Sequence, residues 1–371
     1  MHMRKWMAFL CVFAMMVLTA FHASAAGVTL RTFTPFADLD ASAQVYMDFI
    51  TEWEEKSGNM VEDYSGLTDE AWTQNMLSMV RSGEADVVIV PLGTGLTYEE
   101  LVTVEELIEA VPDMGLRSFA AFEEADGSVL LSPLRVSFEA LYVNEDVLEA
   151  NGLSVPHTYE ELLAVCSALS GSGVTPIANA LGDWPEIVLD CASLASAPAE
   201  EFGSETSLAG AKNMLAALHA VGAFGSDPFS GSDMDAMQAF IDGKAAMRID
   251  SDMLAQMLPS DRQDHVTVIS MPQRAGEEHG VLCGVPGFGV GITRACWEDD
   301  NRCEAAIDFV RELYTGSNGE IHQQLAAGVS GVMGESIADM LLEATDVSGI
   351  LYDAMEGDFD GWASGVIESL R

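Results

Sequence analysis

Residues 138–169, "FEALYVNEDVLEANGLSVPHTYEELLAVCSAL", restrict the possible folds of this chain most. "ALYV" (140–143) predicts a strand, and Asn144 is placed to cap a short helix directly after it. Following a Pro turn, Thr158 and Glu161 have the spacing of a capping box, which predicts the start of a second helix. A strand and two capped helices with so little chain between them predict a rigid unit of an α/β fold.

The same alternation of strands and helices runs through the rest of the chain. A β-branched run at 27–36 predicts a strand, apolar spacing predicts a helix over 41–56, and Thr68 is placed to cap a further helix that stops at Gly83. "DVVIVPLGTG" (86–95) predicts a strand buried on both faces. Further strands are predicted at "VTPIANA", "AAMRID", "HVTVISMP" and "GFGVGIT", further helices at Pro185, Asp233 and Asn301, and mostly helix after Gly328. The pattern predicts α/β lobes with sheets rich in parallel pairs.

Length and the first 26 residues indicate an exported protein of two domains. A chain of 371 residues is too long for one ordinary core. Residues 1–26 have a basic start, an apolar run over 6–21 and small residues that favour cleavage after Ala25 or Ala26. An uncleaved anchor helix is the alternative. Cys11 lies inside the apolar run, so there is no clear lipidation signal, and we expect the periplasm or the outer face of the cytoplasmic membrane.

The charge of the chain excludes some classes of partner. Asp and Glu number 59 against 16 Lys and Arg, which gives a formal net charge of −43. Such a field repels phosphate backbones and anionic lipid surfaces and attracts cationic ligands. We therefore expect no nucleic-acid partner. A solvated acidic shell that keeps an exported protein in solution is the plainer interpretation of the same charge.

The sequence contains few motifs that indicate disulfides, metal binding or catalysis. Without Cys11, five cysteines remain, and Cys296 with Cys303 or Cys166 with Cys191 are conceivable disulfides, although buried free thiols are expected. The histidines share no ligand spacing, and no HExxH or GxSxG motif occurs. No pair of carboxylates stands out as an acid and a base. The sequence therefore predicts no catalytic residue, metal or cofactor, and favours a protein that binds rather than reacts.

Several stretches, in order, resemble one known family. "ALYVNEDVLEANGLSVPHTYEELLAVCSAL", "VTPIANALGDWPEIV", "DAMQAFIDGKAAMRIDSDM" and "GFGVGIT" are similar to elements of extracellular solute-binding proteins of family 1, the group of the maltose-binding protein. The resemblance implies an α/β, two-lobed clamshell of the type II periplasmic-binding-protein class, with a hinge that the chain crosses more than once. The N-terminal lobe would comprise 27–137 and about 276–318, and the C-terminal lobe about 138–275 and about 319–371.

The resemblance also implies a function. Such proteins are monomeric receptors that close around a solute, most often a mono- or oligosaccharide, and deliver it to the permease subunits of an ABC importer. The acidity of the chain favours a cationic solute, such as a polyamine, as an alternative. An exported carbohydrate-active enzyme and a chemosensory receptor are further alternatives.

Candidate ligand-binding residues follow from the family's contact positions. Carried over residue by residue, they are Thr34, Gly93, Thr94, Ser137, Asp183, Trp184, Met253 and Trp362. Asp250 is a further candidate because it lies, like Asp252, near the position of Met253, where a carboxylate suits a cationic group or sugar hydroxyls. Trp53 and Trp72 lie on apolar helical stripes and are expected in the core. Met253 stands where the family has a stacking Trp, so one sugar platform is expected to be missing, which argues against a long maltodextrin-like ligand.

Overall fold

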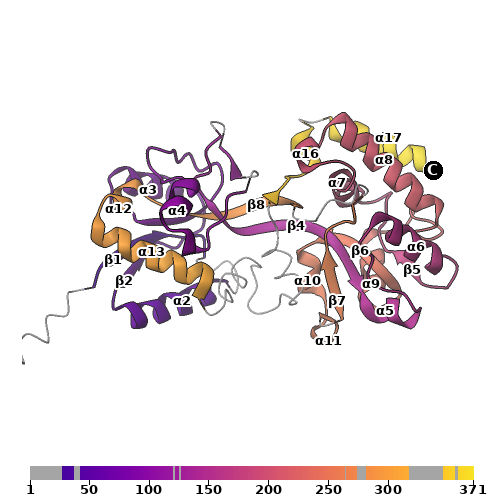
Figure 1. Cartoon of the computed structure of the whole chain (residues 1–371), viewed down its shortest axis with the longest axis horizontal. Helices are drawn as coiled ribbons and strands as arrows, with labels where there is room; N and C mark the ends of the chain where they lie inside the picture. The colour runs from indigo at the N-terminus through magenta and orange to yellow at the C-terminus, as the bar shows by residue number, and fades with distance from the viewer. Residues whose placement is uncertain are drawn as a thin grey trace, which may run out of the picture.

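Two lobes joined by two long neighbouring strands make up the molecule (Figure 1). The computed structural model describes residues 27–36, 42–119, 122–124, 127–263, 265–273, 281–316, 346–355 and 358–371. The expected export signal at 1–26 lies outside these ranges. Within them, no helix combines the length and the apolar character that a membrane crossing needs.

The N-terminal lobe is built from the first third of the chain and from two helices that return to it much later (Figure 1). Its elements are β1 (Thr29–Phe33), α2 (Ser42–Ser57), β2 (Met60–Asp63), α3 (Glu70–Arg81), β3 (Val87–Pro91), α4 (Val104–Ala110), the 3-10 turn η1 (Pro112–Met114), α12 (Arg294–Trp297) and α13 (Asp300–Thr315).

The C-terminal lobe holds the middle and the end of the chain (Figure 1). Its elements are α5 (Glu145–Ala150), α6 (Tyr159–Leu169), β5 (Thr175–Ile177), α7 (Glu186–Leu194), η3 (Ala199–Glu201), α8 (Glu205–Ala220), α9 (Asp233–Ile241), β6 (Ala245–Ser251), α10 (Met253–Met257), α11 (Ser260–Gln263), β7 (Val266–Ile269), β9 (Asp346–Val347), α16 (Leu351–Ala354) and α17 (Phe359–Leu370).

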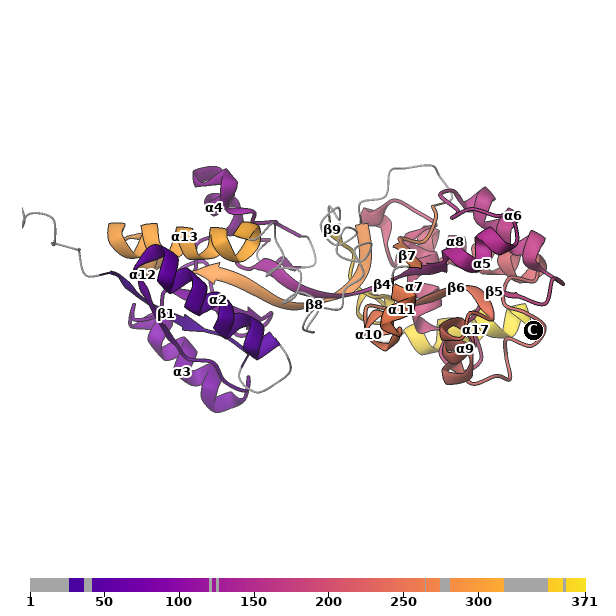
Figure 2. The ribbon, with the colours of Figure 1, turned by 90° about the horizontal axis from the view of Figure 1, so that it is seen from below.

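The lobes are joined by β4 (Ser132–Asn144) and β8 (Val281–Ile292), which run side by side in both views (Figure 2). They pair antiparallel from Ser132↔Val290 to Glu139↔Cys283, and we call this paired segment the crossing. From 317 to 345, the chain between α13 and β9 lies outside the described residues. Among the residues that the structure describes, the two strands of the crossing form a continuous ribbon between the lobes.

The sheet is mixed, with the strand order β2-β1-β3-β8-β4-β6-β5. Parallel pairs occur within each lobe, where β1 pairs with β2 and β3, and β5 with β6. The pairs that involve the crossing strands are antiparallel, except for the short β8–β9 pair. The expectation of parallel-rich sheets was therefore wrong for the centre of the molecule, because strands that enter and leave a lobe side by side run in opposite directions.

The direction of the strands places the carboxyl ends of β3 and β6 near the crossing. β3 runs against β8, with Val87↔Ile292 at its outer end and Pro91↔Phe288 at its inner end. β6 runs against β4 and ends at Ser251, which pairs with Glu139. The carboxyl ends of the parallel strands of both lobes are therefore turned toward the crossing.

Apolar clusters fill both lobes and continue along the crossing. One cluster in the N-terminal lobe contains Trp53, which is 1% exposed as the sequence predicts. A second fills the C-terminal lobe around α6, α7 and α8. A third includes Phe33 of β1, Phe138 of β4 and Phe240 of α9, so apolar packing extends from one lobe to the other.

The expected helix starts are partly confirmed. Asn144 caps α5 through the Val147 N–H, and Thr158 and Glu161 form both bonds of a capping box. The expectation for Thr68 was wrong, because the neighbouring Asp69 accepts from the Trp72 N–H and caps α3. Asp299 similarly replaces Asn301 as the start of α13. In both places two nearby residues have side chains suited to capping, and spacing alone does not separate them.

Two strand predictions were incomplete. The sequence predicts a strand, two helices and a strand over 27–95, and it misses β2 between the two helices. β2 is short, its residues alternate in exposure, and its polar sequence is typical of a loop. β4 and β8 are longer than "ALYV" and "GFGVGIT" because they continue through Pro133 and Pro286, which normally argue against a central strand. The pairing is irregular between Pro133 and Val136, where prolines are tolerated. Of the segment expected to be mostly helical after Gly328, 329–345 lies outside the described residues, and the described remainder opens with β9.

The five cysteines that the structure describes are free, as expected. Cys166, Cys191, Cys283 and Cys296 are buried, and Cys303 is half-buried. Neither of the two conceivable disulfides is formed.

Candidate functional site

The carboxyl edges that face the crossing define the candidate site. In open α/β sheets, ligands bind outside the carboxyl ends of parallel strands, where loops lead from strand to helix. Both lobes offer such an edge, and the crossing lies between them. The residues that follow β1, β2, β3, β5 and β6 are therefore the candidates for ligand contact.

On the N-terminal edge, a hydrogen-bonded polar group follows β1 and β2. Thr34 is buried, and its Oγ1 lies 2.8 Å from Oγ of Ser65 and 3.5 Å from Oδ1 of Asp63. Thr32 donates to the same Asp63 oxygen at 2.6 Å. Burial raises the pKa of Asp63, and the hydroxyl donors oppose this rise. Thr34 thus holds Asp63 and Ser65 in place.

Aromatic rings accompany this polar group. Tyr64 stacks on Phe33 with ring centroids 5.0 Å apart, and the Trp72 ring meets Phe33 edge-on at 5.8 Å. The Trp72 indole N–H donates to the Tyr64 carbonyl at 2.8 Å. Trp72 is half-buried and packs against the apolar cluster that contains Phe33, so the core position that the sequence predicts is confirmed in part.

Gly93 and Thr94 lie in the turn that follows β3. Gly93 has a φ of 74°, a left-handed conformation that glycine adopts without strain. Thr94 is half-buried beside it. Their position at the carboxyl end of β3 keeps both residues candidates for ligand contact.

On the C-terminal edge, Arg248 of β6 organises three segments. Its side chain is only 3% exposed and makes ion pairs with Asp250 and, at 2.6 Å, with Asp233 at the start of α9. It also donates to the Ala178 carbonyl after β5 at 2.7 Å. Burial raises the pKa of Asp250 and the Arg248 charge opposes the rise. Asp250, a sequence candidate, is therefore engaged inside the lobe.

Ser137 and Asp252 join the crossing to the turn after β6. The Ser137 hydroxyl donates to Oδ1 of Asp252 at 2.6 Å, and the Asp252 N–H donates to the Phe138 carbonyl at 2.9 Å. Ser137 is exposed, whereas Asp252 is buried. Burial raises the pKa of Asp252, which the Ser137 hydrogen bond and the Arg135 charge oppose.

Two large apolar side chains stand exposed on the same edge. Trp184, in the loop after β5, is 54% exposed, and Met253, directly after Asp252, is 62% exposed. Asp183 is exposed beside Trp184 and accepts from the Asp233 N–H at 2.9 Å. Exposed rings and thioethers at a strand edge are surfaces that a ligand or the opposite lobe covers.

Trp362 lies on α17, whose Asp360 and Ala363 line one cavity together with Gly182 and Pro185, the residues near Trp184. The Trp362 side chain is half-buried, with its ring 6.1 Å from that of Phe359, and packs against the core of the C-terminal lobe. The structure thus gathers Thr34, Gly93 and Thr94 on one edge and Ser137, Asp183, Trp184 and Met253 on the other. Asp250 and Trp362 occupy packed positions.

Sequence reasoning missed Asp63 and Tyr64, and it named Asp252 only as a carboxylate near the position of Met253. Asp63 ends β2 and Tyr64 follows it, and because β2 was not predicted as a strand, nothing marked its carboxyl end. Asp252 lies in "RIDSDM", where a carboxylate after the strand was visible, but its hydrogen bond comes from Ser137, far away in the chain. Only the β4–β6 pairing brings these two residues together.

The fold is shared with solved solute-binding proteins. The bacterial solute receptor AcbH, described as having an exclusive preference for β-D-galactopyranose, is 13% identical, with a TM-score of 0.65 over 94% of this chain and 97% of that chain. RafE from Streptococcus pneumoniae is 14% identical, with a TM-score of 0.63 over 94% and 97%. A probable secreted solute-binding lipoprotein from Streptomyces coelicolor is 16% identical, with a TM-score of 0.59 over 94% and 99%.

These similarities confirm the two-lobed α/β fold expected from the sequence. No curated protein matches the sequence at a significant level. The family model described as bacterial extracellular solute-binding protein matches residues 48–325, which is most of the chain. The chain belongs to the bacterial extracellular solute-binding protein family.

Proposed function

We propose that this protein is the extracytoplasmic receptor of an ABC importer and captures a carbohydrate between its lobes. The observation that carries the proposal is the placement of the carboxyl edges of both lobes on the crossing, with Trp184 and Met253 exposed on one of them. Bending at the crossing brings the edges together, and contacts made only in the closed form drive the closure.

The chemistry of the edges supports a neutral sugar. Sugar rings offer apolar faces to aromatic side chains and hydroxyls to polar ones. Trp184 supplies a ring face on the C-terminal edge, Asp183 and Ser137 supply polar groups on the same edge, and Thr94 supplies one on the N-terminal edge. The structural relative AcbH, whose described ligand is a monosaccharide, supports the same class. We assign the stacking role to Trp184, and a packing role to Trp362 on α17.

The size of the ligand follows from Met253. A thioether on a flexible stem gives a smaller and softer platform than an indole. With Trp184 as the main exposed ring of the C-terminal edge, the proposed site suits a mono- or short oligosaccharide. The proposed lobe boundaries are the ones that the resemblance implies, with the first, at 138, on β4 and the second, at about 276, before the start of β8.

A cationic solute is the second candidate. Asp63, Asp183 and Asp252 lie on the two edges, and Arg248 is already neutralised by Asp233 and Asp250. The edges thus carry carboxylates whose charge is not balanced by that arginine, and a polyamine would be attracted to them.

The proposal includes the location of the protein and the proteins with which it acts. The export signal at 1–26 delivers the protein across the cytoplasmic membrane, where it acts as a monomer on permease subunits. We propose no catalytic role, since the family consists of solute receptors. Its strong negative charge disfavours nucleic acid.

A ligand screen tests the proposal. Thermal shift and titration calorimetry should show stabilisation by a galactose-like monosaccharide or a short oligosaccharide, and the mass-action relation gives the affinity. Solution scattering should show a smaller radius of gyration with that ligand. Stabilisation by spermidine or putrescine alone would favour the second candidate. Turnover of any glycan would contradict the receptor assignment.

A further inference from the structure

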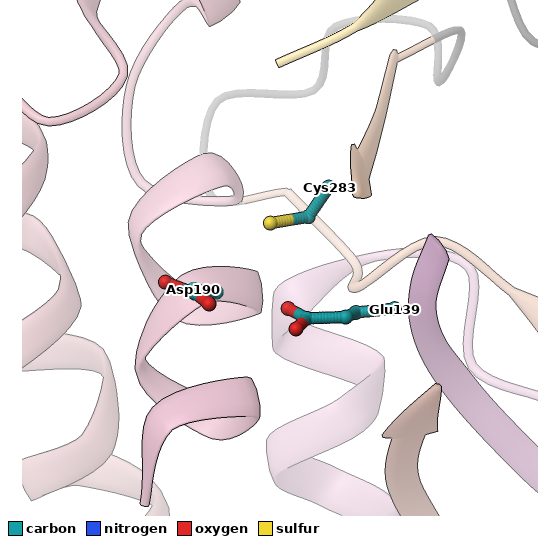
Figure 3. Close-up of side chains that lie close together, drawn as sticks. All are labelled: Glu139, Asp190 and Cys283. Atoms are coloured by element: carbon teal, nitrogen blue, oxygen red, sulfur yellow. The ribbon is translucent and has the colours of Figure 1, made fainter. Parts of the chain in front are cut away.

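A compact acidic cluster lies where the crossing enters the C-terminal lobe. Glu139 of β4 and Cys283 of β8 are direct partners in the strand pairing, and Asp190 of α7 faces them (Figure 3). One carboxylate oxygen from each acid and the Cys283 Sγ all lie within 4.8 Å of one another. The three side chains come from three separate elements and point into one space (Figure 3).

The cluster lacks a balancing positive charge among the residues that the structure describes. The Oε2 of Glu139 is shielded from solvent and pairs with no basic group among them; the side-chain contacts of this carboxyl are the Asp190 carboxyl and the Cys283 thiol. The neighbouring charges that act on Glu139 and Asp190 are also acidic: Asp250, Glu186 and Asp353. Two buried carboxylates in contact are costly without a cation or a proton between them.

The remaining contacts hold the ligand atoms in position. Asp190 accepts the Leu351 N–H at 3.0 Å, which fixes its carboxylate from the start of α16. Cys283 Sγ lies 3.2 Å from the Gly349 carbonyl oxygen and donates to it. These contacts orient the two side chains toward Glu139, and the carboxylate of Glu139 completes the group (Figure 3).

We propose that Glu139, Asp190 and Cys283 bind a divalent transition-metal ion of the zinc class. Zinc accepts thiolate and carboxylate ligands at about 2.0–2.3 Å, so its ligand atoms stand about 3.3–3.8 Å apart. A span of 4.8 Å closes to that range with small side-chain rotations. The thiolate disfavours Mg²⁺ and Ca²⁺, which prefer all-oxygen sites.

A fourth ligand has room beside the cluster. A cavity of about 10 Å³ is lined by Glu139 and Cys283 together with Ser270 and Gln273. That volume is about the size of one water probe, and polar atoms line it. Binding of the ion would release the protons of these side chains, so Zn²⁺ affinity should rise with pH.

Metal at this place would stiffen the hinge. It would join both strands of the crossing to α7, so the inner end of the crossing would move with the C-terminal lobe. Bending would then be confined to the irregular part of the pairing between Pro133 and Val136. This role does not depend on which solute the protein carries.

The experiment measures metal binding directly. Chelator-treated full-length mature protein is titrated with Zn²⁺ and Co²⁺, with Mg²⁺ and Ca²⁺ as comparison ions. We expect one equivalent of Zn²⁺ to bind and raise the Tm, and bound Co²⁺ to show a thiolate charge-transfer band. Glu139→Gln and Cys283→Ser should each weaken Zn²⁺ binding at least tenfold. Loss of binding in both variants, with folding judged by circular dichroism, supports the site.

Cys296→Ser is the matched control, because Cys296 is a buried free thiol in the other lobe. It should leave Zn²⁺ binding unchanged. Binding that survives in Glu139→Gln, or that is lost in Cys296→Ser, would overturn the proposal. So would a chelated protein that takes up no Zn²⁺ up to about pH 8; in that case the carboxyl pair holds a shared proton instead of a metal.

Discussion

The hydroxyl of Ser137 donates a 2.6 Å hydrogen bond to Oδ1 of Asp252 and ties the crossing to the turn after β6. The bond joins an exposed residue of a connecting strand to a buried carboxylate of the C-terminal lobe. Met253 follows Asp252, so the same bond fixes the start of α10 and one exposed side chain of the proposed site.

Ser137→Ala should destabilise the protein by about 1–2 kcal/mol, because a buried carboxylate loses its side-chain donor. Chemical denaturation measures the change. Asp252→Asn keeps an acceptor for the Ser137 hydroxyl without the charge, and should cost less. Equal stability of Ser137→Ala and the unaltered protein would mean that water replaces the hydroxyl without loss.

Arg248→Met should destabilise the C-terminal lobe by about 3–5 kcal/mol, because Asp233 and Asp250 keep their buried charges without a partner. The control is Lys244→Ala, which removes an exposed pair with Asp242 and should change stability by less than about 1 kcal/mol. Thermal unfolding compares the two. Similar small shifts for both variants would contradict the organising role of Arg248.

Trp184→Ala should weaken binding of the identified sugar by about 1–3 kcal/mol, by analogy with aromatic stacking on bases. Because Trp184 is 54% exposed, the Tm of the free protein should change little. Trp362→Ala should show the opposite pattern, lower stability with unchanged affinity, since Trp362 packs against the core. Calorimetric titration of both variants separates the roles, and a loss of affinity in Trp362→Ala alone would reverse the assignment.

Gly284→Ala should disturb the crossing. A Cβ at this position of β8 would collide with the Ser137 carbonyl oxygen and stand 3.0 Å from the Cα of Phe138, so the strands must separate. We expect a loss of about 1–3 kcal/mol, typical of overpacking. Gly361→Ala, on α17 with open space around it, should instead add about 0.5–1 kcal/mol. If denaturant titration shows no change in the free energy of unfolding of Gly284→Ala, the two strands can separate at this position without cost.

The metal-free protein should lose stability as the pH rises. Burial raises the pKa of Asp190 to about 7. An unfolded Asp titrates near about 3.9, so between these pH values the folded protein binds more protons and its free energy of unfolding falls with rising pH. Asp190→Asn should flatten this slope, as Tm measurements in chelator from about pH 5 to about pH 7.5 would show. If the Tm of Asp190→Asn falls with pH as steeply as that of the unaltered protein, groups other than Asp190 cause the pH dependence.

Local signals along the chain predicted the C-terminal lobe well. Asn144, Thr158 and Glu161 act within three residues of their partners, so their caps can be recognised from spacing. The capping candidates Thr68 and Asp69 show the limit of this reasoning, because neighbouring residues with equivalent side chains compete for one helix end. The order of lobes followed from family resemblance rather than from any such local pattern.

The site was less predictable because its contacts are long-range. Ser137 meets Asp252, and Glu139 meets Asp190 and Cys283, only after the strands have paired. No spacing in the sequence marks the three proposed metal ligands, which are contributed by β4, α7 and β8. Asp250 was a candidate because it lies near the position of Met253, but its carboxylate forms an ion pair with Arg248, two residues earlier, inside the lobe.

The pairing of Val88 with Gly291 has a consequence for biogenesis. The first lobe cannot finish its sheet until nearly the whole chain has been made, since β8 and α13 arrive only after most of the second lobe. Until then, β3 presents a bare strand edge to its surroundings. The N-terminal lobe would therefore remain incompletely folded until late in synthesis. A truncated copy that lacks β8 would keep the exposed edge of β3 and would be prone to aggregation.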